Sequence, residues 1–148
     1  MKKINPYLNF PGNTEEAFNF YKSVFGGDFS LFSRFKDTPA AGQVPAAAAN
    51  GIMHVSLPAG DSVMMATDAI PEMGHKVTAG NQVQLCVEAD SKQEADKIFN
   101  GLANGGKVSQ QIADMFWGSY WGSLTDKYGV GWMVNFTPAG GFTNSEQK

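Results

Sequence analysis

The chain has 148 residues, and its 43% hydrophobic and 17% charged content is typical of an ordinary soluble globular protein. Its formal net charge of −3 argues against a nucleic-acid partner, which would require a basic surface. No apolar stretch reaches the roughly 20 residues of a membrane-spanning helix, so we expect no membrane association and a cytoplasmic location.

The first half of the chain predicts a strand, a helix and three further strands. A strand over residues 4–10 precedes a helix over 13–24, where Asn13 stands three residues before Glu16, as in a capping box. Apolar side chains recur at helical spacing at Ala17, Phe20, Tyr21 and Val24. The three strands are expected at 29–35, 51–57 and 62–67, and the Ala-, Pro- and Gly-rich segment 37–50 is interpreted as a mobile loop.

The second half repeats this order. A strand over 82–88 precedes a helix over 91–102, which begins with a capping box of Ser91 and Glu94 and lies 78 positions after the first helix. Its apolar positions are Ala95, Ile98, Phe99 and Leu102, and strands follow at about 107–112, 117–124 and 130–136. We therefore predict an α+β fold of two βαβββ modules in one domain over residues 1–140, with halves at about 1–68 and 81–137 and a flexible tail over 141–148.

The strands alternate between an apolar face and a face of polar and aromatic side chains. This pattern is expected when one face of a sheet packs under a helix and the other does not. The second face would carry Asn, Gln, Ser, Tyr, Met and Trp, a mixture typical of a small-molecule pocket, with Ile52 on the same side as His54. The alternative is that this face is simply hydrated, or is covered by loops or a partner subunit.

Two groups of motifs resemble a known family. The first is Asn5-Pro6-Tyr7-Leu8-Asn9-Phe10, followed by Gly12-Asn13 and a helix with Glu16-Ala17 and Phe20-Tyr21. The second is Phe116-Trp117-Gly118, followed by Asp126-Lys127-Tyr128-Gly129-Val130. Both are similar to the PhnB-like branch of the glyoxalase/bleomycin-resistance (vicinal oxygen chelate) superfamily, and the resemblance extends from about residue 4 to residue 136.

The resemblance implies a half-open barrel-like sheet built from the two modules, and a homodimer. Catalytic members of the superfamily hold a divalent metal with four ligands of the His or Glu type, and strand alignment places those positions at Asn5, Met65, Gln82 and Met133. None of the four is His, Asp or Glu, so we expect no metal ion. Some members carry a demethylubiquinone methyltransferase label. This sequence has no glycine-rich strand–turn–helix motif for a nucleoside, and we expect no cofactor.

Three functions are compatible with these residues. The leading hypothesis is a metal-free protein that binds or sequesters a small organic molecule. The second is a lyase or isomerase of the glyoxalase type that uses a non-metal acid and base, and the third is a protein whose pocket is vestigial and that pairs with another chain. The candidate ligand contacts are Asn5, Tyr7, His54, Met65, Gln82, Gln84, Trp117, Trp121, Met133 and Asn135.

Each of the more suggestive residues has a structural alternative. His54 is a candidate general base, or else a partly buried side chain held by a neighbour. Trp117 and Trp121, on one face of the same expected strand, are candidate stacking walls or packing residues. Arg34 is interpreted as a surface residue, with an anionic ligand as the alternative. Three further residues are interpreted as structural, namely Asp68 at the end of its strand, Asp126 as a cap of the turn to Gly129, and Cys86 as an inert thiol.

Overall fold

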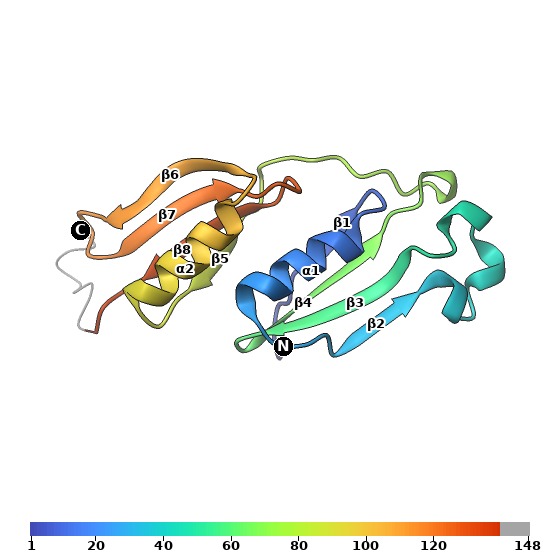
Figure 1. The fold of residues 1–148 in the computed structure, drawn as a ribbon, viewed down its shortest axis with the longest axis horizontal. Helices are drawn as coiled ribbons and strands as arrows, with labels where there is room; N and C mark the ends of the chain where they lie inside the picture. The colour runs from blue at the N-terminus through green and yellow to red at the C-terminus, as the bar shows by residue number, and fades with distance from the viewer. Residues whose placement is uncertain (140–148) are drawn as a thin grey trace. The chain divides into compact units, whose positions relative to one another are not determined.

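The structure, a computed structural model, describes residues 1–139 and divides the chain into two compact units. The first unit comprises Met1–Thr78 and the second begins at Ala79. Each unit contains a four-stranded sheet and a three-turn helix in the order βαβββ (Figure 1). The predicted α+β fold of two βαβββ modules is therefore confirmed. The predicted tail over 141–148 lies outside the described residues.

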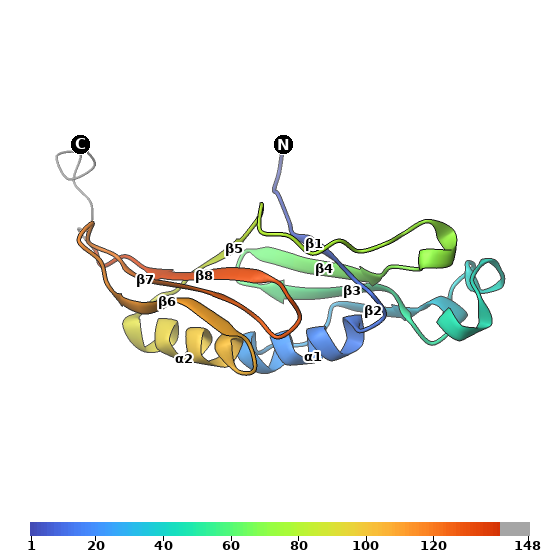
Figure 2. The same cartoon turned by 90° about the horizontal axis from the view of Figure 1, so that it is seen from above.

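In the first unit, helix α1 packs against one face of a sheet with the strand order β1-β4-β3-β2. β1 and β4 are parallel, and the other neighbours are antiparallel. Because α1 lies on one side of this sheet (Figure 2), we call the other side the open face of the first sheet. The elements are β1 (Tyr7–Phe10), α1 (Thr14–Phe25), β2 (Leu31–Arg34), β3 (Ile52–Ala59) and β4 (Ser62–Asp68).

The second unit has the same topology, with the strand order β5-β8-β7-β6 and a parallel β5–β8 pair. Helix α2 lies on one side of this sheet (Figure 2), and the other side is the open face of the second sheet. The elements are β5 (Leu85–Glu88), α2 (Lys92–Ala103), β6 (Lys107–Asp114), β7 (Tyr120–Thr125) and β8 (Gly131–Phe136).

Helix α2 forms as its sequence predicts. All four of its expected apolar side chains are buried, and burial of such side chains stabilises the fold by about 1.5–3 kcal/mol for each large one. Its N-terminus is a capping box, in which Ser91 Oγ accepts a hydrogen bond from the Glu94 amide at 3.0 Å. The Glu94 carboxylate in turn accepts the Asp90 amide at 3.0 Å. Local sequence therefore determines where α2 begins.

Helix α1 differs from its prediction in both its buried face and its cap. Ala17, Phe18 and Tyr21 are completely buried, whereas the expected core residue Phe20 is half-buried. Phe18 packs edge-on against Tyr21, with ring centroids 5.5 Å apart. The side chain of Asn13 makes no capping hydrogen bond, and its Oδ1 is buried without a partner.

The cap of α1 comes from the end of β4 instead. Asp68 Oδ1 accepts the backbone amide of Thr14 at 3.0 Å, and its Oδ2 accepts that of Ile52 at 2.7 Å. The parallel ladder pairs Phe10 with Asp68 and so brings this carboxylate close to the start of the helix. Because a charged carboxylate is a stronger acceptor than an amide and complements the positive helix end, Asp68 takes the place predicted for Asn13.

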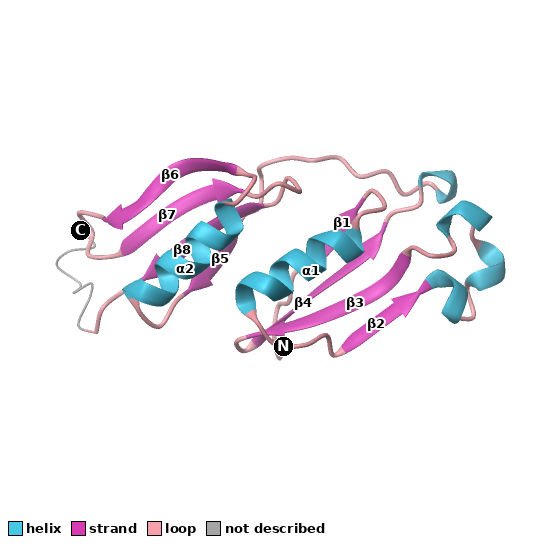
Figure 3. Cartoon of the chain, viewed as in Figure 1, coloured by secondary structure: helices cyan, strands magenta, loops and turns pink. Residues whose placement is uncertain are grey.

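The segment 37–50 contains short helical turns, where the sequence predicted an aperiodic loop (Figure 3). Three 3-10 helices span Phe35–Asp37, Ala41–Gln43 and Ala46–Ala48. Arg34 anchors the end of this segment, because its guanidinium donates to the carbonyl oxygen of Asn50 at 2.8 Å. The same guanidinium forms a two-pronged ion pair with Glu15, at 2.9 and 2.7 Å.

Three strands begin three residues later than predicted, at Tyr7, Leu85 and Tyr120. A strand extends only as far as its partner pairs with it, and the β5–β8 ladder begins at the pair of Leu85 and Trp132. Gln82 and Trp117 therefore lie outside the strands that were expected to contain them. None of the helices in the described part of the chain is both long and apolar enough to cross a membrane.

Candidate functional site

The open face of the first sheet aligns Tyr7, Met65 and Ser56 in one row across three strands. Tyr7 pairs with Met65 in the β1–β4 ladder, and Met65 pairs with Ser56 in the β3–β4 ladder. Side chains at directly paired positions point to the same side of a sheet. Val55 and Leu57, which alternate with Ser56, are completely buried on the side of α1. The row therefore lies on the side away from the helix.

His54 lies beside this row on β3 and has two neighbours in it. Its Nε2 is 2.9 Å from Ser56 Oγ, and its ring centroid is 5.7 Å from that of Tyr7, with the planes tilted by 44°. His54 is half-buried, whereas Tyr7 is 47% exposed. An imidazole in contact with a hydroxyl can donate or accept a hydrogen bond and can exchange a proton with a bound group. This cluster is thus able to bind a polar group or to act as an acid or base.

Ile52 was predicted to share the face of His54, but it lies on the other face of the sheet. The β2–β3 register shifts between Ser33 and Arg34, so that Arg34 pairs with Ile52 while Ser33 pairs with His54. A bulge of this kind interrupts the regular alternation of side chains. Ile52 is 1% exposed and lies with Glu15 of α1 in the lining of a pocket.

Asn5 precedes β1, and its side chain bonds to the backbone of β4. Its Oδ1 accepts the amide hydrogen of Val63 at 3.1 Å, next to a backbone hydrogen bond between Met65 and Pro6 at 3.0 Å. The amide oxygen of Asn5 thus extends the β1–β4 ladder by one hydrogen bond.

The open face of the second sheet aligns Glu88, Asn135 and Trp121 in a corresponding row. Glu88 pairs with Asn135, and Asn135 pairs with Trp121. Asn135 Nδ2 donates to Glu88 Oε2 at 2.8 Å and to Thr137 Oγ1 at 3.1 Å. The next row places Met133 between its partners on β5 and β7. An aromatic ring, a thioether and a fixed amide–carboxylate pair therefore share this face.

Trp117 lies in the turn between β6 and β7 and packs against Trp121. The two ring centroids are 5.9 Å apart, and their planes meet at 64°. Gly118 makes this turn possible with a φ of +96°, a conformation that L-residues rarely adopt. Both tryptophans are half-buried, so part of each ring is available for contact.

Both glutamines precede β5, which begins at Leu85. Gln84 is exposed and borders Gly131, where an added Cβ would lie 3.2 Å from Gln84 Cγ. Gln82 is exposed in the segment that precedes the strand. Gln84 is thus placed beside the open face of the second sheet, at the start of β8.

The four positions that the superfamily uses for a metal do not fit a divalent ion in this chain. The amide oxygen of Asn5 is engaged by Val63, and Met65 and Met133 offer thioethers, which are poor ligands for hard or borderline dications. Gln82 contributes a neutral amide and lies outside β5. Among residues 1–139, no group of three or more His, Cys, Asp or Glu is placed to hold a metal ion.

Sequence reasoning missed Glu88, although the alternation that places Cys86 on the open face also places Glu88 there. Partial removal of water from its thiol, followed by the charge of Glu88, raises the pKa of Cys86 to about 11. Cys86 Sγ lies 3.6 Å from Glu88 Oε1. A thiol with so high a pKa is a poor nucleophile at neutral pH, even though Cys86 is exposed.

Asp126 has the structural role that was predicted for it. Its Oδ1 accepts the backbone amides of Tyr128 and Val130 at 2.8 and 3.1 Å, and its Oδ2 accepts the indole N–H of Trp132 at 2.8 Å. These three hydrogen bonds use the Asp126 carboxylate to stabilise the β7–β8 turn.

Comparison with known proteins gives one family along nearly the whole chain. The sequence profile of the 3-demethylubiquinone-9 3-methyltransferase family matches residues 2–135. "Protein YjdN" of Escherichia coli K12 is 29% identical over 140 residues, which cover 89% of this chain and 93% of that protein.

Solved structures of similar proteins give the same family relationship and the same fold. Protein PA1353 of Pseudomonas aeruginosa is 37% identical, with a TM-score of 0.81 over 91% of this chain and 97% of its own. The PhnB protein of Bacillus cereus is 27% identical, with a TM-score of 0.73 over 91% and 99%. A glyoxalase/bleomycin resistance protein/dioxygenase family enzyme of Burkholderia phytofirmans shares the fold, with 20% identity and a TM-score of 0.60 over 89% and 97%. The resemblance to PhnB-like and glyoxalase/bleomycin-resistance proteins is confirmed.

Proposed function

The chain belongs to the 3-demethylubiquinone-9 3-methyltransferase family, with the glyoxalase/bleomycin resistance fold, and we propose that it binds a small organic molecule at the open faces of its sheets without a metal ion. The observation that carries this proposal is the row on the second sheet. There Trp121, braced by Trp117 at 5.9 Å, stands beside Asn135 on a face that α2 does not cover. Such a combination of aromatic walls with a few oriented polar groups is typical of ligand sites.

The side chains indicate what kind of ligand this face would accept. An indole ring favours a flat or cationic group, and the Met133 thioether adapts its shape to an apolar one. Asn135 donates both amide hydrogens to its neighbours, which leaves its Oδ1 and the Glu88 carboxylate as acceptors. The ligand that fits is therefore a compact aromatic molecule that carries a hydrogen-bond donor.

The open face of the first sheet supplies a second set of contacts of the same kind. Tyr7 and Met65 offer apolar surface, and His54 with Ser56 offers a polar pair 2.9 Å apart. Asn5 supports this face because its side chain accepts a hydrogen bond from Val63, and it does not need to contact the ligand to do so. We propose that Gln84, which borders Gly131, adds a polar contact, and that Gln82 in the segment before β5 does the same.

The donor chemistry supports binding without a metal. Divalent transition metals require imidazole, carboxylate or thiolate ligands, whose charge or basicity offsets the loss of hydration water. The positions used by metal-dependent members offer two amides and two thioethers in this chain.

A second candidate function is acid–base catalysis of a lyase or isomerase reaction. The observation that favours it is the cluster of His54, Ser56 and Tyr7, in which an imidazole touches one hydroxyl and packs near a phenol. A general base within reach of a bound carbonyl compound could remove a proton from the neighbouring carbon. In this alternative, His54→Gln abolishes turnover but leaves ligand binding within about threefold.

Native mass spectrometry of the protein purified from its own host tests the proposal. The expected result is a mass increment of a small molecule that disappears on denaturation and is recovered in the organic extract. Protein that carries Trp121→Ala should retain less of the same compound. Extracts that contain no compound enriched over a control protein, from several growth conditions, would contradict ligand binding.

A further inference from the structure

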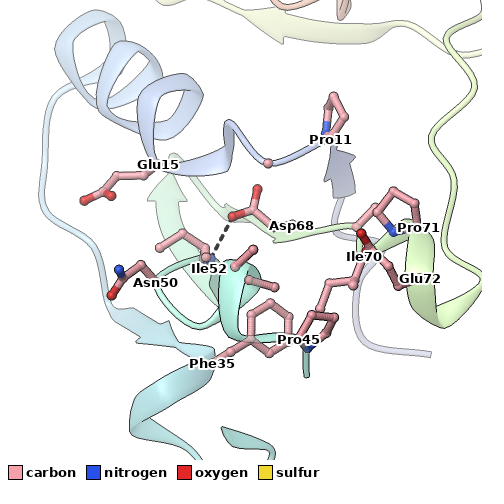
Figure 4. Close-up of a pocket in the computed structure, with 15 residues that line it drawn as sticks. Pro11, Glu15, Phe35, Pro45, Asn50, Ile52, Asp68, Ile70, Pro71 and Glu72 are labelled. Carbon is pink, nitrogen blue, oxygen red and sulfur yellow. Dashed lines mark hydrogen bonds between the residues drawn. The ribbon is translucent and has the colours of Figure 1, made fainter. Parts of the chain in front are cut away.

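A pocket of about 390 Å³ lies within the first unit, on the side of the sheet that carries α1. Its lining comes from the turn before α1, the first turn of α1, the segment 35–52, the end of β4 and the turn at 69–72 (Figure 4). It is distinct from the open faces described above, because neither Tyr7 nor His54 contributes to it. Its volume falls in the range of small-molecule sites.

The walls of this pocket are apolar and well supported. Phe35, Ile52 and Ile70 are 8%, 1% and 5% exposed, so their positions are fixed by the core. Pro45 and Pro71 also line the pocket (Figure 4). The ion pair of Arg34 with Glu15 and the bond from Arg34 to Asn50 hold the segment 35–51 against the helix.

The charges of the lining residues have one sign. Three carboxylates, those of Glu15, Asp68 and Glu72, line the pocket, and no Lys, Arg or His does. Glu15 is neutralised by Arg34 at 2.7 Å. Within residues 1–139, neither Asp68 nor Glu72 has such a partner, so these residues give the pocket a negative charge.

Asp68 is the charged side chain of this pocket whose orientation is fixed by hydrogen bonds. It is 7% exposed and is held by two backbone amides, one on each oxygen, and each carboxylate oxygen can accept a further hydrogen bond. The positive end of α1 also lies here, but Asp68 already caps it and Glu15 and Glu16 occupy its first turn. An anion would therefore meet two carboxylates, whereas a cation would meet compensating charge and the ring of Phe35.

We propose that this pocket binds a small organic cation, a protonated amine with a compact apolar body. The ammonium group bonds to Asp68, Glu72 provides long-range attraction at the rim, and the apolar body fills the space between Phe35, Pro45 and Ile70. The site is separate from the open faces, so the same chain holds two ligands of different chemistry.

Titration of the ¹⁵N-labelled full-length protein with benzylamine at pH 7, followed by NMR, tests this inference. Benzylamine is protonated at this pH, benzyl alcohol is a neutral analogue of similar shape, and benzoate is an anionic one. The expected result is saturable shifts of the Gly12, Gly51 and Ala69 amides with benzylamine, with an affinity at least about threefold higher than for benzyl alcohol and no saturation with benzoate. Equal affinities for the three probes, or no saturable shift at these amides, would overturn the proposal.

Two substitutions and a control test whether the carboxylates of Asp68 and Glu72 attract the cation. Asp68→Asn keeps the shape of the side chain but removes its charge, and should weaken benzylamine binding about tenfold or more if the variant folds. Glu72 is exposed, so Glu72→Gln should leave the fold intact, and the loss of its charge should weaken binding roughly two- to fivefold. The matched control is Asp61→Asn, which removes an exposed carboxylate from the β3–β4 turn outside the pocket. Equal affinities in Glu72→Gln and Asp61→Asn would contradict the site.

Discussion

The backbone amide of Thr14 donates to Asp68 Oδ1 at 3.0 Å, so the last residue of β4 caps a helix that begins 54 positions earlier in the chain. The other carboxylate oxygen accepts the amide of Ile52, which joins α1, β3 and β4 at a single side chain. In the second unit, α2 is capped locally by Ser91. The two modules thus share a topology but differ in how their helices are anchored.

Substitution of these two caps should have unequal effects on stability. Asp68→Ala leaves two backbone amides without their acceptor and should lower the free energy of unfolding by about 2–4 kcal/mol. Ser91→Ala removes one exposed acceptor and should cost about 0.5–2 kcal/mol. Urea unfolding followed by circular dichroism measures both, and an Asp68→Ala effect no larger than that of Ser91→Ala would show that the Asp68 contacts add little.

The contrast between these caps shows what the sequence could predict. Ser91 and Glu94 are three residues apart, so their pattern is complete within one stretch of chain. The pattern at Asn13 and Glu16 is similar, but a stronger acceptor arrives from β4 through a long-range strand pairing. No local pattern could reveal that competitor.

The candidate sites also divide into residues that a local sequence pattern predicts and residues that it cannot predict. Alternation along the strands placed Tyr7, Met133 and Asn135 on the faces away from the helices, and it would also have found Glu88. It failed at Ile52, where the register shift interrupts it. The pocket beside Asp68 was not predicted, because its walls come from segments that have no periodic pattern.

The contact of Trp121 with the ligand can be tested once the ligand is recovered. Trp121→Ala should weaken binding by about 1–3 kcal/mol, since it removes an aromatic wall. Phe32→Ala is the matched control, because Phe32 is 37% exposed and pairs with Val55, which faces α1. Isothermal titration calorimetry measures both variants, and an unchanged affinity in a folded Trp121→Ala protein would assign this residue to packing.

Cys86 should react slowly with alkylating reagents despite its exposure. Its pKa of about 11 lies above the ordinary value of 9.0, so the thiolate fraction at pH 8 is reduced. Iodoacetamide should modify it at least about ten times more slowly than a free thiol, with a rate that rises with pH up to about 11. Glu88→Gln removes the neighbouring charge and should speed the reaction. A rate like that of glutathione at pH 8 would contradict this environment.

We also expect the protein to be a homodimer. Within residues 1–139, the edge strands β1, β2, β5 and β6 each pair with one neighbouring strand, and chains commonly cover such edges by two-fold association. Light scattering at micromolar concentration should give about 32 kDa, twice the 15.9 kDa of the chain. A mass of one chain would contradict the expectation.

Binding of the recovered compound to metal-depleted protein tests the central claim most directly. The protein is dialysed against EDTA, its metal content is measured by elemental analysis, and the compound is titrated by calorimetry before and after addition of Zn²⁺ or Mn²⁺. We predict stoichiometric binding with the same affinity in all three states, because the contacts are aromatic, thioether and amide groups. Binding that is lost with EDTA and restored by a stoichiometric metal ion would contradict the account.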